Sequence, residues 1–193
     1  VQATETPGLQ KAVALKALGR FRHEAVALDP ATGILYLTED RTDGLLYRFL
    51  PETPRDFTKG QLQALAVVGK PSADLRNYDP ATSWPREGES MKVEWVDVED
   101  PEAPLDDLRF RGFKSGAARF ARGEGIHFSE TGIFICCTDG GPDRRGQLFR
   151  LHPSGSPEKP DQLELFLQSS ADDILTNGDN LCPAPWGGVV VCE

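Results

Sequence analysis

Short runs of apolar residues separated by turn signals dominate the chain. The first three runs cover residues 25–28, 34–38 and 45–50, and the dipeptides Asp29-Pro30 and Asp43-Gly44 stand between them. Short apolar runs separated by such turn dipeptides predict an antiparallel meander. Further strands are predicted at 61–68, 92–98, 133–138, 147–151, 163–167 and 188–192.

Helical patterns are weak by comparison. The apolar stretch at 12–18 is short, and 116–121 has room for only one turn. Two long polar segments, 71–89 and 99–109, contain several prolines and are expected to be loops. Loops of this length in a compact domain are usually functional or inserted. The pattern therefore predicts an all-β chain with long loop insertions.

The first meander recurs along the chain. One copy runs from Glu24 to Pro51, a second runs from Glu124 to Pro153, and a truncated third begins at Asp179. Repeats of one small antiparallel sheet each are typical of a β-propeller or a similar array. We expect one incomplete β-propeller segment over 1–193, with blade-like hairpins near 20–51, 61–98, 120–153 and 163–193.

Each copy places two oxygen-bearing side chains at the open end of a hairpin. The pairs, each equally far from the centre of its turn, are Glu24 with Glu39, Glu124 with Asp139, and Asn180 with Glu193. Equidistant residues face each other across an antiparallel hairpin, although a bulge shifts the pairing by one residue. A propeller gathers equivalent hairpin ends around a central channel, so the three pairs are expected to converge on one axial site.

Carboxylates gathered in this way repel each other unless protons, cationic side chains or metal ions neutralise them. Oxygen ligands suit hard cations such as Ca²⁺, and added Cys or His ligands would admit iron or another transition metal. The alternative is that these acids stand at strand ends only because strand ends are exposed. Three copies with matched positions favour the shared site.

The composition agrees with cation binding. The 193 residues include 30 Asp and Glu against 21 Lys and Arg, for a net charge of −9. This balance argues against a nucleic-acid binder, which needs clustered Lys and Arg. No apolar run is long enough for a membrane-spanning helix, and residues 1–9 lack the pattern of a signal peptide.

The four cysteines do not form a recognisable motif. Their spacing does not match a zinc ribbon, and Cys136 and Cys137 are expected to be small buried residues. Cys182 and Cys192 are placed to face each other across the third hairpin, so a disulfide between them is an open alternative.

Two residues beside Glu39 have the chemistry to contact substrate. Asp40 and Arg41 place an acid next to a guanidinium, which suits bidentate contact with phosphate or carboxylate. A local ion pair is the alternative. The sequence contains no Gly-x-Ser-x-Gly, P-loop, GxGxxG before a helix or HExxH motif, so serine-hydrolase and nucleotide-binding functions have no support.

Several segments, taken in order, resemble the PhoX-type alkaline phosphatase family. They are GRFRHEA (19–25), YLTEDR (36–41), LYRFLP (46–51), ARGEG (121–125), CTDGG (137–141), DNL (179–181), PWG (185–187) and CE (192–193). The resemblance runs from about residue 14 to residue 193. The segments occur in the same order as in that family, which makes the resemblance more specific than any one segment.

The resemblance implies a calcium- and iron-dependent β-propeller phosphatase that hydrolyses small phosphate esters. It makes Glu24, Glu39, Glu124 and Glu193 candidate ligands of Ca²⁺ and Fe³⁺, and it makes Asp40 and Arg41 candidates for phosphate contact. It also implies export to the periplasm or beyond by the twin-arginine route. We expect a monomer with no nucleic-acid or membrane partner.

The chain also departs from that family. Members are considerably longer and carry an earlier Cys-Glu-Glu stretch whose Cys helps to bind iron, and that stretch is absent here. We therefore expect a fragment of a larger propeller, with open sheet edges and an incomplete metal site. That the fragment is inactive by itself is an open alternative. Two other functions stay open: a non-catalytic calcium-stabilised scaffold or binding module, and another propeller hydrolase such as a calcium-dependent lactonase.

Overall fold

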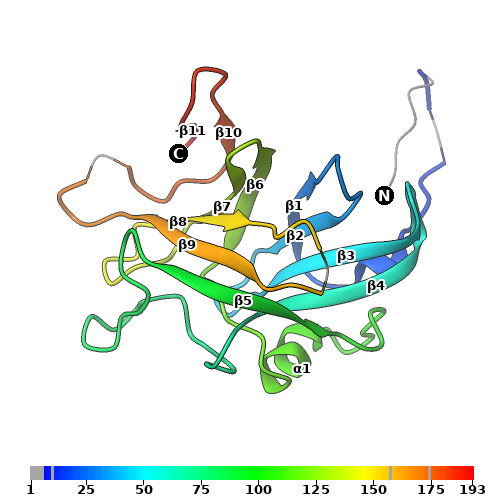
Figure 1. Ribbon diagram of the computed structural model, residues 1–193, viewed down its shortest axis with the longest axis horizontal. Coiled ribbons are helices and arrows are strands. Elements are labelled where there is room, and N and C mark those ends of the chain that lie inside the picture. Colours follow the sequence, from blue (N-terminus) through cyan, green and yellow to red (C-terminus); the bar gives the residue numbers. More distant parts are fainter. Residues whose placement is uncertain (1–6, 10, 157, 174) are drawn as a thin grey trace.

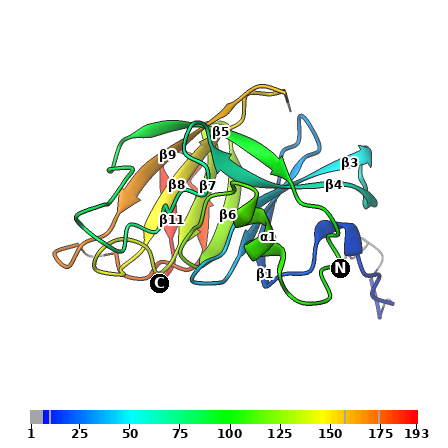
Figure 2. The same ribbon diagram turned by 90° about the horizontal axis from the view of Figure 1, so that it is seen from below.

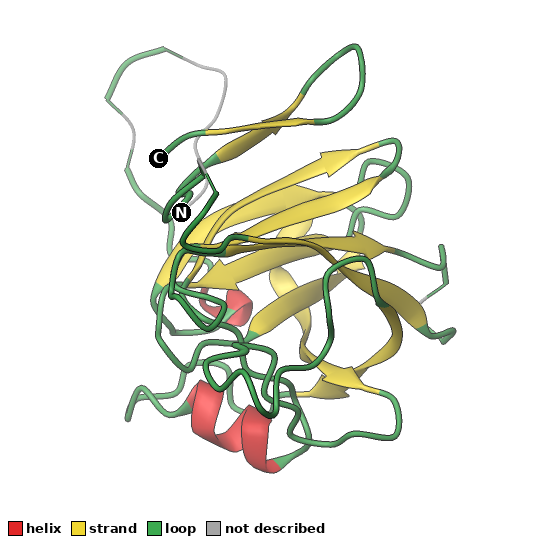
Figure 3. Cartoon of the chain, turned by 90° about the vertical axis from the view of Figure 1, so that its left-hand side faces the viewer, coloured by secondary structure: helices red, strands yellow, loops and turns green. Residues whose placement is uncertain are grey.

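Strands account for most of the regular structure in the computed structural model, which describes residues 7–9, 11–156, 158–173 and 175–193. The helical elements are a 3-10 turn at Lys16–Leu18 and α1 at Leu108–Lys114, both outside the sheet (Figure 3). The strands are β1 (His23–Leu28), β2 (Leu35–Glu39), β3 (Leu46–Thr53), β4 (Asp56–Val67), β5 (Ser90–Asp97), β6 (Gly123–Ser129), β7 (Gly132–Cys137), β8 (Gln147–His152), β9 (Asp161–Gln168), β10 (Leu181–Pro183) and β11 (Val189–Val191).

Nine of these strands form one antiparallel sheet in the order β1-β2-β3-β4-β5-β9-β8-β7-β6 (Figure 1). The meanders β1–β4 and β6–β9 are joined by β5, which pairs with β4 on one side and with β9 on the other. The sheet curls until its two outermost strands, β1 and β6, contact each other. Figure 2 shows these two strands near each other in the view from below. The hairpin β10–β11 is a separate sheet that packs on Phe134 of β7.

Alternate residues of β2 supply two hydrophobic cores. Tyr36 packs inside the curled sheet with Phe149 of β8, whereas Leu35 and Leu37 pack with Tyr47 in a second core on the opposite face. Successive side chains of a strand point to opposite faces, so a strand buried on both faces needs an uninterrupted apolar run. The run at 34–38 has this pattern, and β2 is buried at every position.

The all-β prediction is confirmed, and most predicted runs fall within strands. The prediction of a loop over 99–109 is wrong at its C-terminal end, because α1 begins at Leu108. Leu108 and Gly112 lie four residues apart on the buried face of that helix. The predicted hairpin at 163–193 is divided: β9 belongs to the large sheet, while β10 and β11 form the small one.

The hairpin pairings differ by one or two residues from those expected. In the first hairpin His23 lies opposite Glu39, and a bulge between His23 and Val26 shifts the register. In the second, Ile126 lies opposite Ile135, so Asp139 falls beyond β7 instead of facing Glu124. Bulges add a residue on one strand only, and the spacing of residues does not reveal them.

The third hairpin is also offset. Cys182 lies opposite Val190 rather than Cys192, and the backbone N–H of Cys192 donates to the Asn180 carbonyl at 2.8 Å. All four cysteines are free, so the disulfide left open above is not formed. Cys136 and Cys137 are buried as expected. Within the described residues, no helix combines the length and the apolar character needed to cross a bilayer.

Candidate metal centre

Three carboxylates from distant parts of the chain meet at one end of the curled sheet. Glu24 in β1, Glu124 in β6 and Asp179 before β10 each offer an oxygen, and these oxygens all lie within 4.8 Å of one another. Glu124 is buried, with 5% of its surface exposed, whereas Glu24 and Asp179 are exposed. The structure thus brings together two of the four predicted metal ligands and adds Asp179. We call these three residues the carboxylate cluster.

Gly125 allows the backbone at Asp179 to lie close to the strand that carries Glu124. Its backbone N–H donates to the Asp179 carbonyl at 2.9 Å. A Cβ at this position would lie 2.7 Å from Asn180 Oδ1, 2.8 Å from Asn180 Cα and 3.0 Å from the Asp179 carbonyl oxygen. Only a residue without a side chain admits so close an approach of two backbones.

An arginine joins the cluster to a second buried acid. Arg122 donates from Nε to Asp40 Oδ1 at 2.7 Å and from Nη2 to Glu124 Oε1 at 2.8 Å. Asp40 is 5% exposed and also lies 3.4 Å from Arg22 Nε. The backbone N–H of Arg122 donates to the Arg41 carbonyl at 2.9 Å, which fixes the chain at this point. These contacts orient the guanidinium toward the cluster.

The crowding of negative charge changes the protonation of Glu124. Burial, together with the negative charges of Asp40, Glu24 and Asp179, raises the pKa of Glu124 to about 7 against the opposing effect of Arg122. Without a cation, Glu124 is therefore about half protonated at pH 7. A bound cation would favour the ionised form instead.

Cys136 fixes the backbone next to Asp179. Its Sγ donates to the Gly178 carbonyl at 2.9 Å, and burial raises the pKa of this thiol to about 12. The neutral thiol is the hydrogen-bonding form, so the side chain holds the segment that carries Asp179.

Two predicted ligands lie outside the carboxylate cluster. Glu39 is buried on the other side of β2, where its Oε2 accepts from the Leu45 N–H at 3.1 Å and from the Tyr47 hydroxyl at 3.0 Å. Burial raises the pKa of Glu39 to about 7, and its Oε1 has no hydrogen-bond partner among the described residues. The carboxylate of Glu193 is exposed and accepts from the Thr176 N–H at 2.6 Å.

The predicted phosphate contacts are likewise separated. Asp40 lies beside Arg122, but Arg41 turns away and its Nη2 donates to Asp106 Oδ2 at 3.2 Å. The residues missed by sequence reasoning are Arg122 and Asp179. Both stand inside quoted segments, ARGEG and DNL, one or two residues from a candidate.

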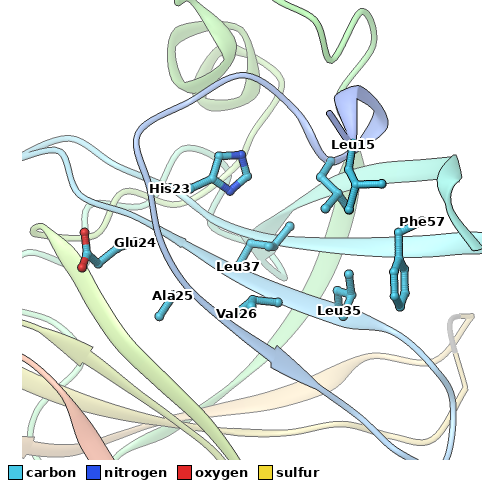
Figure 4. Close-up of a pocket in the computed structure, with 9 residues that line it drawn as sticks. Leu15, His23, Glu24, Ala25, Val26, Leu35, Leu37 and Phe57 are labelled. Atoms are coloured by element: carbon cyan, nitrogen blue, oxygen red, sulfur yellow. The ribbon is translucent and has the colours of Figure 1, made fainter. Parts of the chain in front are cut away.

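An apolar pocket lies next to the cluster. It has a volume of about 420 Å³ and is lined mainly by aliphatic and aromatic side chains, among them Leu15, Leu35 and Phe57. Figure 4 shows Glu24 at one side of this pocket and Phe57 at the other. His23, which also lines it, stacks on Phe21 with ring centroids 3.7 Å apart.

Nearly the whole chain is similar to known proteins of one family. The family described as alkaline phosphatase PhoX matches residues 2–193. No curated protein matches. Among solved structures, the chain is similar to Pseudomonas fluorescens PhoX in complex with vanadate, a transition state analogue, with a TM-score of 0.65 and 18% sequence identity.

That similarity covers 91% of this chain and 39% of the solved PhoX chain, so this chain spans well under half of that protein's length. At this identity the similarity shows the fold, which agrees with the predicted all-β, partial-propeller architecture. The family match covers nearly every residue and confirms the resemblance seen in the ordered segments of the sequence. The chain therefore belongs to the PhoX family of alkaline phosphatases.

Proposed function

We propose that this protein is a metal-dependent hydrolase of small phosphate esters, with a cation held by Glu24, Glu124 and Asp179. The convergence of these carboxylates from three separate segments is the observation that carries the proposal. Family membership supports the reaction class, and so does the fold similarity to a PhoX that was solved with vanadate, a transition state analogue.

The oxygens of the cluster suit a hard cation of the size of Ca²⁺. Calcium binds protein oxygens at about 2.3–2.6 Å, so two ligands of one ion stand at most about 5 Å apart. The three carboxylate oxygens lie within 4.8 Å of one another. All three donors are oxygen atoms, which hard cations prefer. We therefore propose Ca²⁺ for the cluster, while Fe³⁺ stays a prediction of the family resemblance.

Arg122 is the proposed phosphate-binding residue. Its Nε and Nη2 are used by Asp40 and Glu124, but its Nη1 forms no hydrogen bond in the part of the chain that the structure describes. The side chain is 40% exposed beside the cluster. A guanidinium with free N–H groups is well suited to a phosphoryl group.

Each residue then has a defined task in ester hydrolysis. Arg122 binds and orients the phosphoryl oxygens, and Asp40 keeps the guanidinium in place. Glu24, Glu124 and Asp179 hold the cation, which would supply Lewis-acid stabilisation of the negative charge that develops on the phosphoryl oxygens. As parts of the same proposal, the substrate is a small phosphate ester, the protein acts as a monomer, and its location is periplasmic or extracellular.

The test is a Glu124→Gln variant beside a matched control, Glu130→Gln. Glu130 is an exposed glutamate in the turn between β6 and β7. Calcium binding by calorimetry and hydrolysis of p-nitrophenyl phosphate are measured for both variants and for the unaltered protein. We expect Glu124→Gln to lower calcium affinity and turnover by at least about 100-fold, and Glu130→Gln to change neither.

Undiminished calcium binding and turnover in the Glu124→Gln variant would refute the assignment. Calcium binding without turnover of the ester by the unaltered protein would contradict the hydrolase proposal and favour the calcium-stabilised scaffold.

A further inference from the structure

The two strands that carry Glu24 and Glu124 are the outermost strands of the sheet. β1 pairs only with β2 and β6 pairs only with β7, and no ladder joins β1 to β6 within the described residues. The strands nevertheless contact each other. The spacing between Glu24 and Glu124 therefore depends on interactions other than strand pairing.

A single buried hydroxyl bridges the two strands at the level of the carboxylate cluster. Thr38 Oγ1 accepts the Ala25 backbone N–H at 3.0 Å and donates to the Glu124 carbonyl at 2.6 Å. Thr38 is 1% exposed, so water does not compete for these groups. One partner is Glu124 itself, and the other is the residue that follows Glu24.

The chemistry of this bridge requires a hydroxyl. Ala25 offers a donor and the Glu124 carbonyl is an acceptor, so the bridging atom must accept and donate at once. Serine and threonine do this, whereas valine, which has nearly the same shape as threonine, does neither. The branched Cβ of Thr38 also restricts χ1, which favours one direction for the hydroxyl.

We propose that Thr38 is a positioning residue for the cation site, because its hydroxyl sets the distance between Glu24 and Glu124. This inference rests on the proposed function, since it assumes that the carboxylate cluster holds a cation. Without the hydroxyl, the Ala25 N–H and the Glu124 carbonyl lose their common partner. The two strands then separate, and their carboxylates no longer reach one ion.

The test compares four variants of the full chain. Thr38→Val removes the hydroxyl at nearly constant shape, and Thr38→Ser keeps it. Thr38→Ala leaves room for a water molecule, so it replaces the valine variant if that variant does not fold. Thr32→Val is the control, because Thr32 lies in the turn at the other end of the same hairpin and its hydroxyl donates to Asp29 Oδ2 at 2.7 Å.

Calcium affinity is measured by calorimetry, and the unfolding temperature is measured in excess EDTA. We expect Thr38→Val to weaken calcium binding by about 10- to 100-fold, with Thr38→Ala in the same direction. Thr38→Ser should restore the affinity, and Thr32→Val should leave it unchanged.

A merely structural role would lower the unfolding temperature in EDTA and leave the calcium affinity of the folded variant unchanged, and that result would overturn the inference. The proposed function would still stand if Glu124→Gln abolished calcium binding in the same assay. Failure of the unaltered protein to bind calcium would overturn both.

Discussion

Replacement of Gly125 by alanine tests whether the carboxylate cluster needs the close approach of two backbones. The added methyl carbon would lie 2.8 Å from Asn180 Cα and 3.0 Å from the Asp179 carbonyl oxygen. Carbon atoms in ordinary contact stand about 3.5–4.0 Å apart, so the segment at Asp179 must retreat by about 1 Å. Gly125 does not have the positive φ that favours glycine, so this contact is the whole perturbation.

Such a retreat exceeds the tolerance of a metal site. Ligand distances in protein sites hold to within about 0.2 Å, so a 1 Å displacement removes Asp179 from the shared ion. We expect calcium affinity, measured by calorimetry, to fall by about 10- to 100-fold. Overpacking of this kind should also lower the free energy of unfolding by about 1–3 kcal/mol.

Gly112→Ala separates the two effects. A Cβ at Gly112 would lie 2.7 Å from Leu45 Cδ1, in the core beside α1 and outside the carboxylate cluster. This variant should change the free energy of unfolding and leave calcium affinity intact. If Gly125→Ala binds calcium as tightly as the unaltered protein, the close approach does not position Asp179 and the reasoning is refuted.

Four other predictions rest on the same structure. Calcium affinity should fall as the pH is lowered through about 7, because the raised pKa of Glu124 means that calcium must displace a proton; calorimetry at pH 6 and 8 checks this, and equal affinities would contradict it. In the cation-free protein, the stability of the fold depends on pH in the opposite direction. The folded state holds a proton that the unfolded chain releases above pH 4.5, so the unfolding free energy in urea and EDTA should decrease as the pH rises from 4.5 to about 7. Arg122→Gln should lower kcat/KM for p-nitrophenyl phosphate by about 100-fold, whereas Arg86→Gln, at an exposed arginine, should not. Phe149→Ala should cost about 3–5 kcal/mol in urea unfolding because Phe149 is fully buried, and Phe110→Ala, at a half-exposed position, should cost about 0.5 kcal/mol or less.

The strands and the repeat were predictable because they depend on neighbours along the chain. An apolar run with a turn dipeptide at each end, such as 34–38 after Asp29-Pro30, specifies a buried strand wherever it lies in the fold. The recurrence of oxygen-bearing side chains at the open ends of the repeated hairpins predicted Glu24 and Glu124 as ligands. Both belong to the cluster.

The register of the strands and the final ligand set were decided by the tertiary structure. A bulge before Val26 and a short turn at Gly132 shift two hairpins, and a shift of one residue turns a side chain to the opposite face of a sheet. Glu39 therefore packs against Tyr47 on the other face of β2. No local pattern encodes such a shift.

The sequence by itself determined the all-β character, the repeated hairpins and two acidic residues of the candidate site. Only the tertiary structure decided that β5 joins the two meanders, that Asp179 completes the cluster and that Arg122 points toward it. The physical reason is that strand propensity and turn chemistry act over a few residues. The meeting of residues 24, 124 and 179, in contrast, depends on how the whole sheet curls and on which backbones can approach closely.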